Sequence, residues 1–262
     1  MKFLKVFTVF ALFISFLGIE SRVYGEEQQE ELYIPEGFET AKIFDSSEGP
    51  IEDSSVQIYA VQNSLQGIAN SQVGTDEGIS DVQIVKNETR PLQELRSLTT
   101  EEVITQYKTD IEIQAIRKWD ENSGDNKGNI RGYISIYWDK YKGKPSDPTE
   151  LYVGIDKIDY RFTNKNWGNW YVSADLDYFQ VGPTANGANG SKQYKLNKKS
   201  IIKDGSLVTE LVRNNGWSPV LETSGASSVG ARIDADVYPL VSGGRVDFFT
   251  VGLMIVGDPY IP

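Results

Sequence analysis

The sequence contains no cysteine, so disulfide bonds cannot hold the fold together. Sites in which a metal is bound by thiolates are excluded for the same reason. The chain has 262 residues, of which 39% are hydrophobic and 11% aromatic. A chain of this length can bury a core that is large enough to be stable without covalent cross-links.

Histidine is absent as well. A Ser-His-Asp triad, a Cys-His pair and a histidine-ligated zinc are therefore impossible. Carboxylates, tyrosine, lysine or a serine–lysine pair would have to carry any catalysis, and a metal would need oxygen ligands. The sequence thus favours a non-catalytic protein and gives no indication of a metal or a cofactor.

Long apolar runs are missing except at the N-terminus. There, Lys2 and Lys5 precede an apolar run over 6–19, and a polar stretch then ends at Gly25. This order is typical of a secretory signal peptide over 1–25. The run is too short for the roughly 20 apolar residues that span a bilayer. We therefore expect secretion, to the medium or the cell surface, and no transmembrane segment in the mature chain.

Positive charge is scarce and unevenly placed. Residues 26–95 hold 15 acidic and 3 basic residues, whereas residues 96–262 are nearly neutral. We interpret 26–95 as an acidic leader or pro-segment, with strand-like islands at 55–61 and 81–85, and 96–262 as the main domain. The overall acidity argues against nucleic acid as a partner. The lysines between 192 and 203 indicate a solvated edge or a contact with an anionic polymer.

Alternating apolar residues predict strands in most of the chain after residue 110. The segments are 111–115, 130–138, 151–162, 170–176, 207–212, 218–221, 229–237 and 246–256. Seven to eight such strands, joined by turns, predict an antiparallel β-sandwich or a partly open barrel. The apolar parity shifts between Ile155 and Ile158, which indicates a bulge. Thr99 and Glu102 have the spacing of a capping box, which predicts one short helix near residues 99–108.

The stretch DENSGDNKGN, residues 120–129, has two interpretations. A calcium loop starting at Asp120 finds an oxygen ligand at Asn122, but Gly124, Asp125 and Arg131 occupy three other required positions wrongly. The same glycines and asparagines are typical of a turn between two strands. We favour the hairpin turn.

Two pairs of carboxylates each fall on one side of a predicted strand. Asp175 and Asp177 form the first pair, and Asp234 and Asp236 the second. Residues two apart in a strand are separated by roughly 6.6 Å, within the range that glycosidases use. Any polar strand face offers the same spacing, so a carboxylate-dependent glycoside hydrolase is an alternative rather than the main hypothesis.

Aromatic residues among asparagine and glycine supply the main hypothesis. Flat rings beside amide groups suit stacking on sugars, so carbohydrate or a cell-wall polymer is the leading ligand class. We expect Trp167 and Trp217 to be exposed and near each other. A secreted toxin or pore-forming protein with a removable leader is a further alternative. The candidate ligand-binding residues are Trp167, Trp170, Tyr171 and Trp217.

Overall fold

The computed structural model describes residues 32–45, 57–62, 79–117, 128–164, 170–185, 191–202, 205–239 and 247–257. Residues 34–262 form one compact unit, and the fold given below is that of its described residues. These residues are almost entirely strands, and all of the strand pairs are antiparallel. The prediction of a mainly-β antiparallel fold is therefore confirmed.

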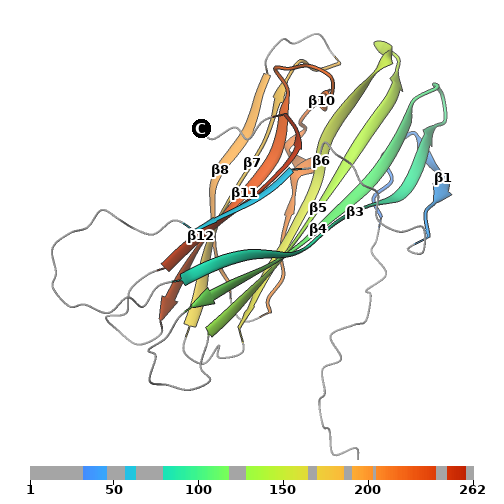
Figure 1. Cartoon of the computed structure of the whole chain (residues 1–262). Coiled ribbons are helices and arrows are strands. Elements are labelled where there is room, and N and C mark those ends of the chain that lie inside the picture. The colour runs from blue at the N-terminus through green and yellow to red at the C-terminus, as the bar shows by residue number, and fades with distance from the viewer. Residues whose placement is uncertain are drawn as a thin grey trace, which may run out of the picture. The chain divides into compact units, whose positions relative to one another are not determined.

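The first sheet, called sheet A, is built around four long strands that are consecutive in the chain (Figure 1). The β1 strand covers one edge, and β9 and β10 both pair with β6 at the other. Its strands are β1 (Phe38–Ile43), β3 (Ile79–Ser97), β4 (Val103–Arg117), β5 (Gly128–Lys144), β6 (Asp147–Asn164), β9 (Val208–Leu211) and β10 (Val220–Leu221).

The second sheet, called sheet B, has the order β2-β12-β11-β7-β8. It brings together strands from both ends of the described chain, because β2 pairs with β12. Its strands are β2 (Gln57–Gln62), β7 (Trp170–Gly182), β8 (Ser191–Ile202), β11 (Ser228–Pro239) and β12 (Asp247–Val256).

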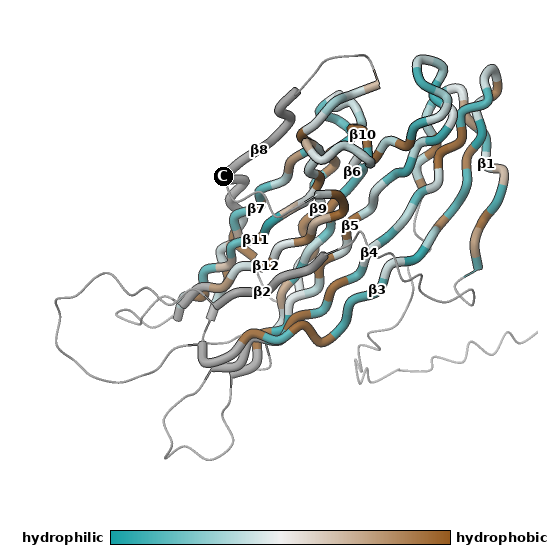
Figure 2. Tube along the Cα trace, turned by 45° about the horizontal axis from the view of Figure 1, so that its top comes forward, coloured by the Kyte–Doolittle hydropathy of each residue, from teal (hydrophilic) through white to brown (hydrophobic). Residues whose placement is uncertain are grey.

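The two sheets share one hydrophobic core. Apolar residues alternate along β4, β5 and β6 on one side and along β7, β11 and β12 on the other, and they belong to a single buried cluster. Figure 2 shows the matching alternation of hydrophobic and hydrophilic residues along β4 and β5. Phe162 of sheet A and Phe249 of sheet B meet edge to face, with ring centroids 6.0 Å apart. The side of each sheet that faces away from this core is called its outer face.

The bulge predicted in β6 is present. Pairing with β5 skips Asp156, because Trp138 pairs with Ile155 and Tyr137 with Lys157. The N–H group of Ile155 donates to Oε1 of Gln180 on β7, at 2.6 Å. Gln180 is buried, and its Nε2 donates to the carbonyl of Ser218 at 3.2 Å. One side chain of sheet B therefore satisfies a backbone group of sheet A at its irregular point.

Residues 208–221, called the strap, comprise β9, the 3-10 helix η3 (Val212–Asn215) and β10. The strap pairs with β6 on both sides of the bulge, at 157–160 and at 152–153. It also reaches sheet B, because the buried Tyr178 hydroxyl donates to Glu210 at 2.6 Å and accepts from Asn215 at 3.1 Å. The strap thus connects β6 of sheet A with β7 of sheet B.

The prediction of a helix near residues 99–108 was wrong. Residues 103–117 form β4, which pairs with β3 on one side and β5 on the other. The residues that suggested a helix cap make turn contacts instead, since Oγ of Ser97 accepts from the N–H groups of Thr99 and Thr100. Pairing on both sides of a segment rich in Val, Ile, Thr and Tyr outweighs the marginal stability of one short helix.

The described residues form twelve strands, more than the seven or eight expected. Part of the segment 26–95 accounts for three of them: β1 and β3 join sheet A and β2 joins sheet B. The two strand-like islands therefore fall in different sheets, and the expected boundary at residues 95 and 96 falls inside β3. The lysine-rich segment supplies β8, an edge strand, where lysines discourage pairing with other chains.

The connection between β4 and β5 is a hairpin, because Arg117 pairs with Gly128. This agrees with the turn interpretation of DENSGDNKGN, although residues 118–127 lie outside the described residues.

We predict that Gln180→Ala lowers the free energy of unfolding by about 1–3 kcal/mol, because it leaves the buried N–H group of Ile155 without an acceptor. Urea denaturation of the purified protein measures the change. Gln83→Ala, at an exposed position of β3, serves as the control and should change stability by less than about 0.5 kcal/mol. Equal stability of the two variants would show that the fold does not need the hydrogen bonds that Gln180 makes between the sheets.

Candidate functional site

The outer face of sheet A carries cross-strand rows of charged and polar side chains. Opposite Tyr137 of β5 lie Lys108 of β4 and Lys157 of β6. The next row places Asp110, Ser135 and Asp159 across the same three strands. Cations and carboxylates therefore occupy successive rows on neighbouring strands.

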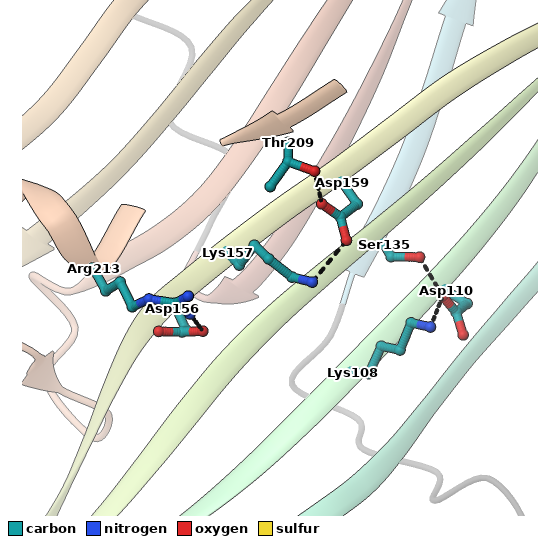
Figure 3. Close-up of polar contacts among 8 residues, drawn as sticks. All are labelled: Lys108, Asp110, Ser135, Asp156, Lys157, Asp159, Thr209 and Arg213. Carbon is teal, nitrogen blue, oxygen red and sulfur yellow. Dashed lines mark hydrogen bonds and ion pairs between the residues drawn. The ribbon is translucent and has the colours of Figure 1, made fainter. Parts of the chain in front are cut away.

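These groups bind one another, as Figure 3 shows. Lys108 lies 3.4 Å from the carboxylate of Asp110, which also accepts from Ser135. Asp159 lies 2.9 Å from Lys157 and accepts from Thr209 of the strap at 2.7 Å. Each ion pair lies within one strand, whereas the hydrogen bonds from Ser135 to Asp110 and from Thr209 to Asp159 cross between strands. Cross-strand pairs of this kind each contribute a few tenths of a kcal/mol to about 1 kcal/mol and favour the observed register. We interpret this part of the face as a charge ladder that stabilises sheet A.

A buried pair of carboxyl groups lies beside this ladder. Asp139 of β5 and Asp156 of β6 are 5% and 9% exposed. The bulge places Asp156 near the strap, where Arg213 donates to its carboxylate at 2.7 Å. Asp139 accepts from the hydroxyl of Tyr141 at 3.3 Å. The two carboxyl groups thus come from different strands, and one of them, that of Asp139, is strongly desolvated.

Burial, and after it the nearby carboxylate of Asp156, raise the pKa of Asp139 to about 8 against the opposing effect of Tyr141, Gln106 and Arg213. Burial also raises the pKa of Asp156, and Arg213 and Lys157 oppose that rise. Asp139 is therefore protonated at neutral pH, which reduces the repulsion between the two groups. Carboxyl groups with this arrangement act as general acids in hydrolases.

The outer face of sheet B brings the two predicted carboxylate pairs together. Strands β7 and β11 are neighbours, and Asp175 lies opposite Asp234. Asp177 lies opposite Arg232, and Asp236 opposite Ser173. Arg232 also donates to Asp234 from two nitrogen atoms. The sequence predicted that each pair shares a strand face, and pairing of the strands unites all four acids on one face.

A pair of stacked tyrosines lies at the end of the same face. Tyr171 of β7 and Tyr238 of β11 are paired in the register, and their ring centroids are 4.8 Å apart with an angle of 9° between the planes. Both side chains are half-buried. The hydroxyl of Tyr238 donates to Asp236 at 3.3 Å. Burial, with Asp236 next in importance, raises the pKa of Tyr238. Two parallel rings therefore adjoin a carboxylate at the edge of a polar face.

The candidate aromatic residues do not form one group. Trp217 is half-buried, packs against the core and lies 5.2 Å from Tyr178 between ring centroids. Tyr178 is seven residues from Tyr171 on β7, about 23 Å along an extended strand. Trp170 begins β7, with its side chain outside the description, and Trp167 lies outside the described residues. The expectation that Trp217 is exposed is wrong, because the side chain is half-buried against the core. That Trp167 is exposed and lies near Trp217 remains a prediction.

Among the described residues, no group of three or more acidic side chains is arranged to hold a metal ion. Within the same part of the chain, we find no helix with the length and apolarity of a membrane span. Comparison of the chain with protein-family models, with curated proteins and with solved structures gave no match. A proposal on function therefore depends on the side-chain geometry alone.

Sequence reasoning missed Asp139 and Asp156 and the partner of Tyr171. Asp139 occupies an ordinary polar position of an alternating strand, and its burial depends on the assembled sheet, where Gln106 of β4 lies opposite it and is itself 5% exposed. The parity shift in β6 was the available signal for Asp156. The pairing of Tyr171 with Tyr238 depends on a register between strands far apart in the sequence, which no local pattern records.

We predict that Asp139→Asn flattens the pH dependence of stability. In the wild type, unfolding releases the proton of Asp139 between the unfolded pKa near 4 and the folded pKa, so stability falls as pH rises from about 4 to about 8. The slope from one group reaches at most about 1.4 kcal/mol per pH unit. Urea unfolding at several pH values compares the variant with the wild type.

The matched control is Asp147→Asn, at a half-buried position where the carboxylate accepts from Thr149 and Tyr152. It should retain the pH profile of the wild type. If the profiles of Asp139→Asn and the wild type are parallel from pH 4 to 8, Asp139 does not hold a proton in the folded protein.

Proposed function

We propose that the protein is secreted and acts by binding carbohydrate or a cell-wall polymer at the outer face of sheet B. The binding surface is centred on Tyr171 and Tyr238 and continues along the strands to Ser173 and Asp236. The stacked tyrosine pair beside a carboxylate is the observation that carries the proposal.

Sugar rings have apolar C–H faces and polar hydroxyl edges. An aromatic ring packs against the first, and carboxylate and hydroxyl groups bind the second. Stacking of Tyr171 on Tyr238 holds both rings in one orientation, so less side-chain entropy is lost on binding. In the sequence, Tyr171 directly follows Trp170 and comes four residues after Trp167, the two other candidate aromatic residues of this segment.

A carboxylate-dependent hydrolase is the second candidate function. The observation in its favour is the Asp139–Asp156 pair, in which two carboxyl groups from different strands differ in environment. Both are less than one-tenth exposed, which favours a structural role over contact with a polymer. Release of reducing sugars from cell-wall glycans that is lost in both Asp139→Asn and Asp156→Asn would support the hydrolase.

We predict that Tyr171→Ala reduces binding to the glycan or cell-wall fraction that the wild type retains by at least about tenfold, because it removes one ring of the pair and exposes the other. A panel of immobilised glycans and cell-wall fractions identifies the ligand, and titration measures the dissociation constant. Trp167→Ala tests the neighbouring loop in the same assay.

The matched control is Tyr133→Ala. Tyr133 is also half-buried on an outer face, but on sheet A, where Arg161 lies 4.8 Å from its ring. It should bind like the wild type. An equal loss in Tyr133→Ala and Tyr171→Ala, or no retention of any fraction by the wild type, would contradict the proposed function.

A further inference from the structure

The face next to the tyrosine pair is acidic. Along β7 and β11 it carries Asp175, Asp177, Asp234 and Asp236, and Arg232 is the base on those two strands. Lys199 of β8 stands opposite Asp175 in the register. On β7 and β11 acids therefore outnumber bases four to one, whereas β8, on the other side of β7, carries Lys192, Lys195, Lys198 and Lys199. The local field thus favours a positively charged ligand on the β11 side of the face, around Asp236.

A buried hydroxyl lies within this face. Ser173 is two residues from both Tyr171 and Asp175 on β7 and is opposite Asp236. It is 3% exposed, and its Oγ atom has no hydrogen-bond partner among the described residues. Leaving such a group unsatisfied costs about 1–3 kcal/mol. A polar ligand group that enters between the tyrosine pair and the acids would recover that cost.

We propose that the ligand is a cationic amino sugar, that is, a polyhydroxylated ring with a protonated amine, as in a de-acetylated glucosamine polymer. This inference rests on the proposed function and specifies its substrate class. The ammonium group binds the carboxylate of Asp236 beside the face of Tyr238, and a hydroxyl of the ligand pairs with Ser173.

Two physical effects act together on such a ligand. An ammonium group is attracted to the face of an aromatic ring within about 6 Å, and more strongly where water is excluded. A charge-assisted hydrogen bond to a carboxylate is roughly twice as strong as a neutral one. The hydrogen bond between Tyr238 and Asp236 places the ring and the carboxylate side by side, so one ammonium group can contact both.

Calorimetric titration with a glucosamine hexamer and with the N-acetylglucosamine hexamer tests the inference. The wild type should bind the glucosamine hexamer at least about tenfold more tightly, and this preference should shrink as salt is added. Asp236→Asn should lose about tenfold in affinity for the glucosamine hexamer and little for the acetylated one. Ser173→Ala should weaken both, because it removes a contact to a hydroxyl.

The control is Asp110→Asn, which removes a carboxylate from the outer face of sheet A and should bind both hexamers like the wild type. Equal or tighter binding of the acetylated hexamer, with no effect of Asp236→Asn, overturns the inference but leaves the proposed function standing if Tyr171→Ala still weakens binding. If the wild type binds neither hexamer, the inference fails. If it also retains no glycan or cell-wall fraction, the proposed function fails with it.

Discussion

The backbone N–H group of Ile155 must be paired, because an unsatisfied donor in a core costs more than most single contacts contribute. Gln180 supplies the acceptor from the other sheet and at the same time binds the carbonyl of Ser218 in the strap. One buried amide thus connects sheet A, sheet B and the strap. The bulge that creates this requirement also sets the position of Asp156, so the electrostatics around Asp139 depend on the same irregularity.

The two outer faces use charge differently. On sheet A, lysines and carboxylates alternate in rows and bind one another, with Thr209 and Arg213 of the strap taking part. Such a face gains its stability from internal pairs. On β7 and β11 of sheet B, acids are in excess and lie beside two stacked rings and a buried hydroxyl. We propose that this combination of groups recognises a ligand in a chain that has neither disulfide bonds nor histidine.

Sequence patterns succeeded where structure depends on local alternation. They predicted the β class, the bulge in β6 and the shared faces of the two carboxylate pairs. They failed at residues 103–108, where pairing on both sides made a strand of a segment with a helix-like start. They predicted no strand at β8, although the lysines there indicated a solvated edge. They could not show that Asp175 lies opposite Asp234 or that Tyr171 stacks on Tyr238, because the register of distant strands follows from the assembled core.

Aromatic NMR spectra recorded during titration with the bound cell-wall fragment test the central claim most directly, because they report on each tyrosine ring. If the ligand binds at the tyrosine pair, the ring signals of Tyr171 and Tyr238 shift together along one binding curve, whereas those of Tyr133 and Tyr141 on sheet A remain unchanged. Shifts confined to Tyr133 and Tyr141, with Tyr171 and Tyr238 unaffected, would place the binding face on sheet A and contradict the account.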